Sequence, residues 1–536
     1  DRNRKLEYSL GSKINEQWQL FSFDIPSDWV QPIRITGFGT HNYSARNESG
    51  KTTLYVDQLV VETDTTDVDP NTGKLKSWTP GPAMKDGKPA PQPVTPLLST
   101  NLSTTQQHNI FAGRQPTLQL SARSWLEGTR TGTFSWTITD AAGNRVATDS
   151  KNVTVESQLA LSQTLSLPRF GLYTTEAQMK WDGGAIVKES MQLAYLPQPV
   201  KLTQQQKEDS PYGMNVHGGR SRMIQTFRDA GMVWFRDYAF NYKWMVRAKG
   251  ADKTYSGWPW FPPMVKEYND AGAMLLACHP DAIADFNEFN TENADDIKPD
   301  LNWTREMVDL LLAFPSIKYH ELDNEYDLPS QGNAKFEVGK GWPNYQNYHK
   351  KFGEIVNLIG DGKLVAVENG RAGTWPQRLI NDIESGSFKN IDVVNTHHYC
   401  GVDPPEINVN NNNTDGVTQT IAKLYFDQLR DIEKISGMDG KPRPHWVTEF
   451  GWDTKAGHIV SHLEQAAYLQ RSYMMFMAAG VDKAFWFFDL DSKDANNFFD
   501  GCGLVDHEQK PKLAICSFAA LAHLLPTPKY VGMLDA

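Results

Sequence analysis

The ten residues 445–454, HWVTEFGWDT, hold the pattern that decides the fold. A short run of β-branched and aromatic residues ends at an acidic residue, Glu449, and amphipathic helical sequence follows from Leu463 to Ala479. The same alternation of short apolar runs with longer helical segments begins after about Pro211. It predicts a parallel sheet whose strands are joined by crossover helices.

Eight strand candidates in the region 205–536 predict a (β/α)8 barrel, because this fold repeats one strand and one helix eight times. The strands are expected at residues 213–217, 232–237, 274–278, 318–322, 363–367, 392–397, 445–449 and 483–488. Helices are expected between them, among others at 305–314, 345–358 and 463–479.

The sequence before the barrel predicts all-β modules. Residues 1–67 alternate apolar and polar positions, and Leu54–Glu62 resembles the last strand of jelly-roll carbohydrate-binding modules. This region is about half a jelly roll, so we expect further sequence upstream of it. A Pro-rich linker is expected at 68–97, followed at 98–204 by an immunoglobulin-like β-sandwich in which Phe134, Trp136 and Ile138 alternate.

Composition excludes two classes of partner. The formal net charge is −11 and no basic cluster is present, so we expect no nucleic-acid binding. The apolar stretches are shorter than the roughly 18 residues of a membrane span.

The four cysteines lack zinc-site spacing, and we expect them to be buried free thiols. The polar start Asp1–Lys5 is not a signal peptide, so the protein is either intracellular or numbered after removal of its leader. The appearance of the N-terminal region favours the second alternative, and we expect a secreted, periplasmic or cell-surface protein.

A barrel of this kind carries its active site at the carboxyl ends of its strands, so polar residues that end apolar runs are the candidates. They are Asn215, His217, Arg236, Asp237, Asp323, Asn324, Glu325, His397, Tyr399, Glu449 and Trp486. Glu325 and Glu449 end different strands that converge on one face. Two such carboxylates suit glycoside hydrolysis, in which one donates a proton and the other attacks or activates water.

Two motifs carry a family resemblance. HELDNEYDLP, at 320–329, resembles the strand-four motif of clan A glycoside hydrolases, and HWVTEFGWDT resembles their strand-seven motif. Within this clan of retaining enzymes the sequence looks closest to family 39, with families 5 and 51 as other candidates. The resemblance implies that Glu325 is the acid/base, that Glu449 is the nucleophile, and that Asn324 binds the hydroxyl next to the reacting carbon.

The resemblance also implies supporting roles for other residues. Arg236 would hold the nucleophile ionised, His397 and Tyr399 would supply a hydrogen-bonding group beside it, and Trp486 would lie under the reacting sugar. It further implies a carboxyl separation of about 5–5.5 Å, whereas an inverting pair stands about 6.5–9.5 Å apart. The sequence departs from the family pattern after Glu325, where Tyr326 replaces a proline.

Further aromatic residues are candidates for stacking on sugar rings, although core packing explains them equally well. They are Trp258 and Trp260, which follow strand two, Trp375, which follows strand five, and Trp452, which follows Glu449.

Two alternatives remain open from the sequence. One is a non-catalytic carbohydrate-binding or scaffold protein with an inactive barrel, and the other is a metal-dependent hydrolase. His217, His279, His397 and His398 could be metal ligands, but the ordered carboxylates explain the site without a metal. His320-Glu321 does not complete an HExxH motif, because residue 324 is Asn. We therefore expect a polysaccharide or oligosaccharide substrate, no cofactor and no metal; the oligomeric state stays open.

Overall fold

The computed structural model describes most of the chain from residue 98 onward. The described residues are 84–85, 88–89, 98–124, 128–184, 186–217, 223–251, 255, 261–283, 299–325, 342–359, 363–365, 375–406, 431–432, 434–455 and 459–532. The predicted jelly-roll-like region at 1–67 lies outside them. Of the expected linker, only the two short strands β1 (Met84–Lys85) and β2 (Lys88–Pro89) are described, and they pair antiparallel.

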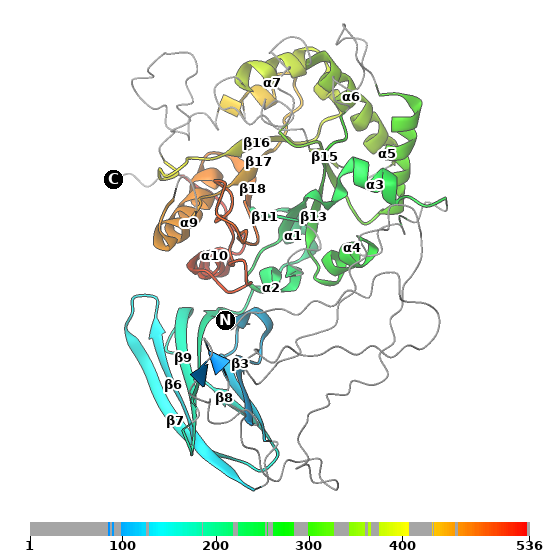
Figure 1. Cartoon of the computed structure of the whole chain (residues 1–536). Helices are drawn as coiled ribbons and strands as arrows, with labels where there is room; N and C mark the ends of the chain where they lie inside the picture. The colour runs from blue at the N-terminus through cyan, green and yellow to red at the C-terminus, as the bar shows by residue number, and fades with distance from the viewer. Residues whose placement is uncertain are drawn as a thin grey trace, which may run out of the picture.

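Two sheets form a β-sandwich in the region 98–204 (Figure 1). Their facing sides share one apolar core, which includes Leu120 from one sheet and Phe134 and Met179 from the other. Every second residue of β6 between Phe134 and Ile138 is buried, as the sequence predicted. The five-stranded sheet has the order β4 (Ile110–Ala112), β10 (Ile186–Leu196), β9 (Gly171–Trp181), β6 (Arg130–Asp140), β7 (Arg145–Val155), and the three-stranded sheet has the order β3 (Leu98–Thr104), β5 (Thr117–Ser124), β8 (Gln158–Thr164).

An eight-stranded parallel sheet follows the sandwich and contains all eight expected strands. Its order is β15-β14-β13-β12-β11-β18-β17-β16, so the first strand pairs with the last and the sheet curls (Figure 1). Nearly all described side chains of these strands are buried, which explains why each reads as a continuous apolar run. The strands are β11 (Tyr212–Val216), β12 (Trp234–Asp237), β13 (Met274–His279), β14 (Tyr319–Leu322), β15 (Lys363–Val365), β16 (Val394–His398), β17 (His445–Phe450) and β18 (Val481–Trp486).

Helices lie between these strands and on the outside of the curled sheet (Figure 1). Each of the three helical segments expected from the sequence is present, as α5, α6 and α9. Side-chain caps fix two of the starts: Asp300 caps α5, and Ser461 forms a capping box with Glu464 at α9. The helices are α1 (Gln204–Glu208), α2 (Ile224–Asp229), α3 (Tyr242–Ala248), α4 (Phe261–Asp270), α5 (Leu301–Ala313), α6 (Trp342–Ile359), α7 (Trp375–Glu384), α9 (His462–Ala478) and α10 (Leu513–Leu524).

Among the described helices, none has the length and apolar character that crossing a membrane requires. The four cysteines are all buried and free, as expected for isolated cysteines in large domains.

The inside of the curled sheet is closed at the amino ends of the strands by an aromatic cluster. Trp234, Trp446 and Phe485 pack together there. The ammonium group of Lys483 lies 4.7 Å from the ring centre of Trp234 and 5.2 Å from that of Trp446. Burial lowers the pKa of Lys483 to about 8. Because this cluster fills the interior at the amino ends of the strands, polar side chains of a site are expected at the carboxyl ends.

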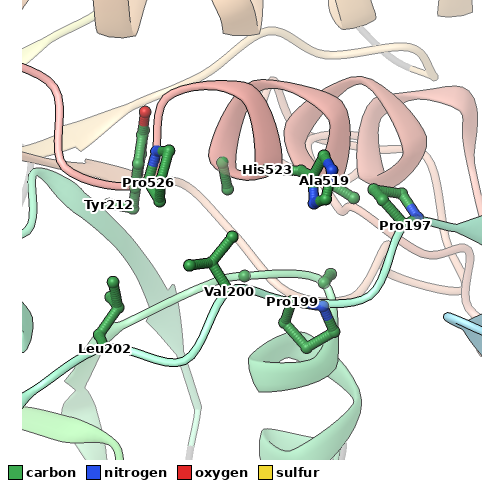
Figure 2. Close-up of a pocket in the computed structure, with 11 residues that line it drawn as sticks. Pro197, Pro199, Val200, Leu202, Tyr212, Ala519, His523 and Pro526 are labelled. Carbon is green, nitrogen blue, oxygen red and sulfur yellow. The ribbon is translucent and has the colours of Figure 1, made fainter.

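The sandwich and the curled sheet meet through α10, which contacts β9 and β10. Ile110, Ala194 and Leu196 of the sandwich belong to the same apolar core as the sheet and its helices. A pocket at this junction, lined among others by Pro197, Tyr212 and Ala519, has a volume of about 20 Å³ (Figure 2). That volume holds about one water molecule, so the pocket is too small for a sugar.

Buried histidines make the stability of the fold depend on pH. Burial lowers the pKa of His279 to about 4 and that of His349, His398 and His445 to about 3. Each is therefore neutral in the folded protein at pH 6, whereas in the unfolded chain it begins to bind a proton below about pH 6.5. The folded state binds fewer protons, so its stability must fall as the pH decreases from 6.5 towards 3.

We predict that His445→Gln reduces this loss of stability. His445 accepts or donates one hydrogen bond of 2.8 Å with Thr396, and a glutamine can keep that bond without titrating. The pH dependence of the free energy of unfolding should become shallower by up to about 1.4 kcal/mol per pH unit between pH 6 and pH 4. Denaturant titrations over this range measure it. The exposed His523, changed to Gln, is the control, and an equal slope in both variants would contradict the prediction.

Candidate active site

Glu325 and Glu449 lie close together at the carboxyl ends of the strands. His397 on β16 is in register with Glu449 on the neighbouring strand β17. The register of β16 with β17 shifts just before His397, and that of β17 with β18 shifts around Glu449. The Nδ1 atom of His397 is 2.9 Å from Oε1 of Glu325 and 3.3 Å from Oε2 of Glu449. One oxygen of each carboxylate and one ring nitrogen of His397 all lie within 4.8 Å of one another. The sequence-predicted pair is thus brought to one site.

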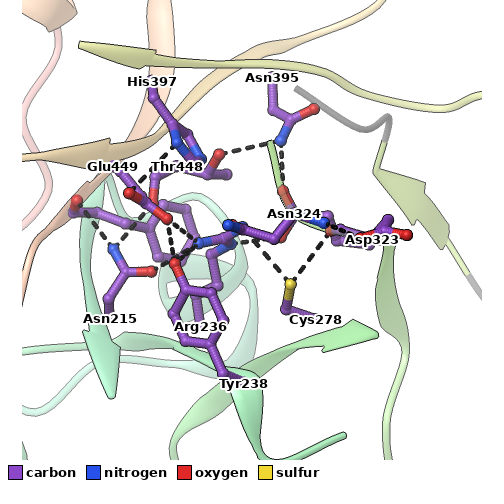
Figure 3. Close-up of polar contacts among 12 residues, drawn as sticks. Asn215, Arg236, Tyr238, Cys278, Asp323, Asn324, Asn395, His397, Thr448 and Glu449 are labelled. Carbon is purple, nitrogen blue, oxygen red and sulfur yellow. Dashed lines mark hydrogen bonds and ion pairs between the residues drawn. The ribbon is translucent and has the colours of Figure 1, made fainter. Parts of the chain in front are cut away.

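Three side chains hold the carboxylate of Glu449 from two sides. Arg236 and Tyr238 both donate to Oε1, the former over 2.7 Å (Figure 3). Tyr399 donates to Oε2 over 2.7 Å. Both oxygens are therefore fixed by charge-assisted hydrogen bonds, which are stronger than bonds between neutral groups.

Arg236 is buried and reaches side chains from several strands. Burial disfavours its charge, but electrostatic contributions from Cys278, Glu321 and Glu449 leave its pKa well above the usual value. The guanidinium is therefore charged at every working pH. It contacts Glu321. Its other polar contacts are Asn215, Tyr238, Cys278, Asn324 and Glu449 (Figure 3).

Glu321 is the buried carboxylate beneath Arg236. Burial raises its pKa and Arg236 opposes that shift. Asn395 donates to its other oxygen and also donates to the hydroxyl of Thr448 over 3.0 Å. These contacts form a polar layer between the aromatic cluster and the two carboxylates.

The backbone that carries Glu325 has an unusual conformation. Asp323 and Glu325 have φ angles of +66° and +46°, in the left-handed region that residues other than glycine rarely adopt. The carboxylate of Asp323 accepts hydrogen bonds from the amides of Ile283 and Asn324, over 3.1 and 2.8 Å. Burial raises its pKa to about 7. Such strained residues often occur at functional sites.

His397 is a neutral imidazole in this site. Burial lowers its pKa to about 3, although Glu449 acts in the opposite direction. A neutral ring has one N–H donor, and only a proton on Nδ1 can be shared with oxygens of both carboxylates. His397 therefore links Glu325 to Glu449.

The remaining predicted contacts to substrate divide into two groups. The structure brings His217 and Asn324 to the site: His217 stacks on Tyr238 with ring centres 5.0 Å apart, and Asn324 accepts from Arg236 over 2.8 Å. Trp258 and Trp260 lie outside the described residues. Trp375 starts α7, but its side chain is also outside them.

The structure does not support Trp486 and Trp452 as platforms for sugar rings. Both indoles are 0% exposed and they stack on each other with centres 6.1 Å apart. Their N–H groups donate to the backbone carbonyls of Cys502 and Asp403, each over 2.9 Å. Core packing covers both rings, so this expectation is corrected.

Other aromatic rings lie at the site and were not anticipated from the sequence. Tyr399 packs edge-on against Phe487 and Phe499, with centres 6.3 and 5.2 Å apart. Phe499 remains 39% exposed. Phe487 directly follows β18, and Tyr238 directly follows β12, so a search of positions just beyond each strand could have found them. Phe499 does not directly follow a strand, so this search would not have found it.

The histidines considered as metal ligands do not form one cluster. His279 pairs with His320 at 3.2 Å, and His398 contacts the thiol of Cys400 at 2.9 Å. Within the described part of the chain, the group with the geometry to hold an ion is Glu325, His397 and Glu449.

Comparisons with known proteins support the fold. No protein-family model and no curated protein matches the chain. Among solved structures, it is similar to a family 39 glycoside hydrolase from the gut symbiont Bacteroides cellulosilyticus WH2, with 19% identity and a TM-score of 0.59 over 81% of this chain and 85% of that one. The chain has the fold of this family 39 enzyme. The resemblance predicted from the two motifs is thus confirmed at the level of the fold.

Two further similarities have TM-scores below 0.5, too low to compare folds. One is to Bacteroides uniformis β-glucuronidase 2 covalently bound to cyclophellitol-6-carboxylate aziridine, with 14% identity over 78% of this chain and 50% of that one and a TM-score of 0.38. The other is to a glucosidase from Croceicoccus marinus, with 11% identity over 58% of this chain and 66% of that one and a TM-score of 0.42.

We predict that Arg236→Met lowers the free energy of unfolding by about 3–5 kcal/mol, because it leaves Glu321 and Glu449 buried without their cation. Adding Glu321→Gln to this variant should restore part of the loss by removing one uncompensated charge. Denaturant titrations compare these variants with Arg471→Met, which breaks a half-exposed ion pair with Glu406 and should cost about 1 kcal/mol or less. Equal losses for Arg236→Met and Arg471→Met would contradict the prediction.

Proposed function

We propose that the protein is a retaining glycoside hydrolase that cleaves a β-linked polysaccharide or oligosaccharide. Glu325 acts as the acid/base and Glu449 as the nucleophile. The observation that carries the proposal is a pair of carboxylates with oxygens within 4.8 Å but with different surroundings. Glu449 accepts from Arg236, Tyr238 and Tyr399, whereas Oε1 of Glu325 contacts the neutral ring of His397.

The short separation favours retention over inversion. Direct attack by a carboxylate needs the two groups about 5–5.5 Å apart, whereas an inverting pair needs about 6.5–9.5 Å to hold a water molecule between them. One oxygen of each carboxylate lies within 4.8 Å of the other, which supports the closer arrangement of the two groups.

The surroundings of the two carboxylates support these roles. Arg236 provides a fixed positive charge 2.7 Å from Glu449 and orients an ionised nucleophile. The side chain of Glu325 is 14% exposed and follows the end of β14, so it can exchange a proton with substrate and water. Asn324 precedes it and is oriented by Arg236 for a substrate hydroxyl.

The reaction then proceeds in two steps. Glu325 gives its proton to the glycosidic oxygen while an oxygen of Glu449 bonds to the anomeric carbon, and the bond from that carbon to the leaving oxygen breaks. In the second step, Glu325 takes a proton from water as the water oxygen attacks the same carbon. Glu449 leaves as a carboxylate, and the sugar is released with its original configuration.

The proposal extends to the rest of the chain. The curled sheet closes as a (β/α)8 barrel, the β-sandwich before it is immunoglobulin-like, and the enzyme acts outside the cytoplasm on a glycan. The parallel strand order and the fold shared with the family 39 enzyme support the first of these statements.

We predict that Glu449→Ala lowers kcat/KM on aryl β-glycosides by about 10⁴-fold or more, because no nucleophile remains. Azide should restore turnover and give a glycosyl azide of inverted configuration, since it attacks the anomeric carbon once. In Glu325→Ala, azide should intercept the covalent intermediate and give the retained glycosyl azide. Product analysis by nuclear magnetic resonance distinguishes the two anomers.

Glu406→Gln, which removes a carboxylate paired with Arg471 away from the site, is the matched control and should keep wild-type activity. Glycosyl azides of the opposite configurations would exchange the two roles. A wild-type protein that binds glycans but hydrolyses none on a broad panel would instead support the carbohydrate-binding alternative.

We also predict that Phe499→Ala raises KM for the polymeric substrate about 2–10-fold with a smaller change in kcat. The exposed ring beside Tyr399 offers a face for a sugar, and an aromatic contact of this kind is worth about 0.5–1.5 kcal/mol. Steady-state kinetics on polymer and on a short aryl glycoside measure it. Phe170→Ala is the control, because Phe170 is also exposed, at 51%, on the sandwich and also packs on a tyrosine. An unchanged KM would exclude this role.

A further inference from the structure

The three groups at the centre of the site also have the arrangement of metal ligands. Nδ1 of His397 is 2.9 Å from an oxygen of Glu325 and 3.3 Å from an oxygen of Glu449, and the two oxygens are within 4.8 Å of each other. We infer that Glu325, His397 and Glu449 bind a transition-metal dication such as Zn²⁺, and that this ion inhibits the enzyme. The inhibition rests on the proposed function, whereas the binding does not.

The spacing of the donor atoms suits Zn²⁺. Zinc binds histidine nitrogen and carboxylate oxygen at about 2.0–2.2 Å, so neighbouring donors in a tetrahedral site stand roughly 3.3 Å apart. The two distances from Nδ1 of His397 bracket this value. A small movement of Glu325, the most exposed of the three, brings the two oxygens to the same spacing.

The chemistry of the donors also suits a transition metal. A neutral imidazole binds a metal through the ring nitrogen that carries no proton, and Nδ1 of His397 is the nitrogen that faces both carboxylates. A set that includes an imidazole favours Zn²⁺ over Mg²⁺, which prefers oxygen ligands in octahedral geometry.

The surrounding residues orient the ligands and leave negative charge to be balanced. Tyr399 donates to the same oxygen of Glu449 that faces His397, while Arg236 holds the other oxygen. Hydrogen bonds of this type around a metal site fix its ligands. Among the described residues of the site, the guanidinium of Arg236 forms ion pairs with both Glu321 and Glu449, so one positive charge is shared by two carboxylates and a dication beside Glu325 is favourable.

Zinc and substrate would exclude each other. An ion between Glu325 and Glu449 occupies the oxygen that attacks the anomeric carbon and the oxygen that carries the proton. Zn²⁺ is therefore expected to inhibit competitively, with a raised apparent KM, an unchanged kcat and full reversal by a chelator.

Binding is tested first, without reference to activity. Isothermal titration calorimetry of the chelator-treated full chain should show one Zn²⁺ per molecule and at least about 10-fold weaker binding of Mg²⁺. His397→Asn and Glu325→Gln should each weaken Zn²⁺ binding at least about 10-fold, because each removes one of three ligands. His523→Asn, a change of an exposed histidine on α10, should leave binding unchanged. Circular dichroism establishes that each variant is folded.

The outcomes separate the two proposals. Absence of Zn²⁺ binding, or equal weakening in His523→Asn, overturns the metal site and leaves the proposed hydrolase intact. Loss of wild-type activity on chelation with recovery on adding Zn²⁺ overturns both the inhibition and the two-step mechanism. Site-specific binding by a protein that hydrolyses no glycan supports the metal site while the proposed function fails.

Discussion

The buried guanidinium of Arg236 is the interaction on which the rest of the site depends. It reaches Asn215 on β11, Glu321 on β14 and Glu449 on β17 from its own place on β12. A buried charge is tolerated only when it is paired and hydrogen-bonded, so each of these side chains must keep its position for the others to be stable. Four strands that are far apart in the sequence are thereby fixed relative to one another, and the orientation of Glu449 follows from the stability of the fold itself.

The layers inside the curled sheet explain how such a polar group can be buried. The aromatic cluster around Trp234 and Trp446 closes the amino ends of the strands. Above it, Asn395 and Thr448 supply neutral hydrogen-bonding groups around Glu321. Since hydrogen bonds are electrostatically stronger in a medium of low dielectric constant, this arrangement rigidifies the layer that supports Glu325 and Glu449.

The sequence was sufficient to predict the eight strands and the polar residues at their ends. Buried parallel strands appear as apolar runs in the sequence, and the polar residues that follow these runs are easily recognised. The sequence was insufficient to predict the contacts of side chains within strands. Glu321 is an example, because its partner Arg236 is 85 residues away in the sequence. Trp486 shows a second limit. Successive side chains of a strand point to opposite faces, so Phe485 enters the inner aromatic cluster while Trp486 joins the core beneath the helices. A residue type at a strand end does not reveal which face it occupies; that depends on the register.

The two carboxylates differ in how firmly the chain holds them, and this difference matches the different roles that the proposed two-step reaction gives them. Glu449 lies within β17, where the ladder and three donors fix it. Glu325 stands beyond the end of β14 on a strained backbone and retains some exposure. A nucleophile must be placed accurately against one carbon, whereas an acid/base must serve a leaving group and then a water molecule in succession. The same freedom of Glu325 lets it close around an ion, so a site arranged for a shared proton is also open to a metal.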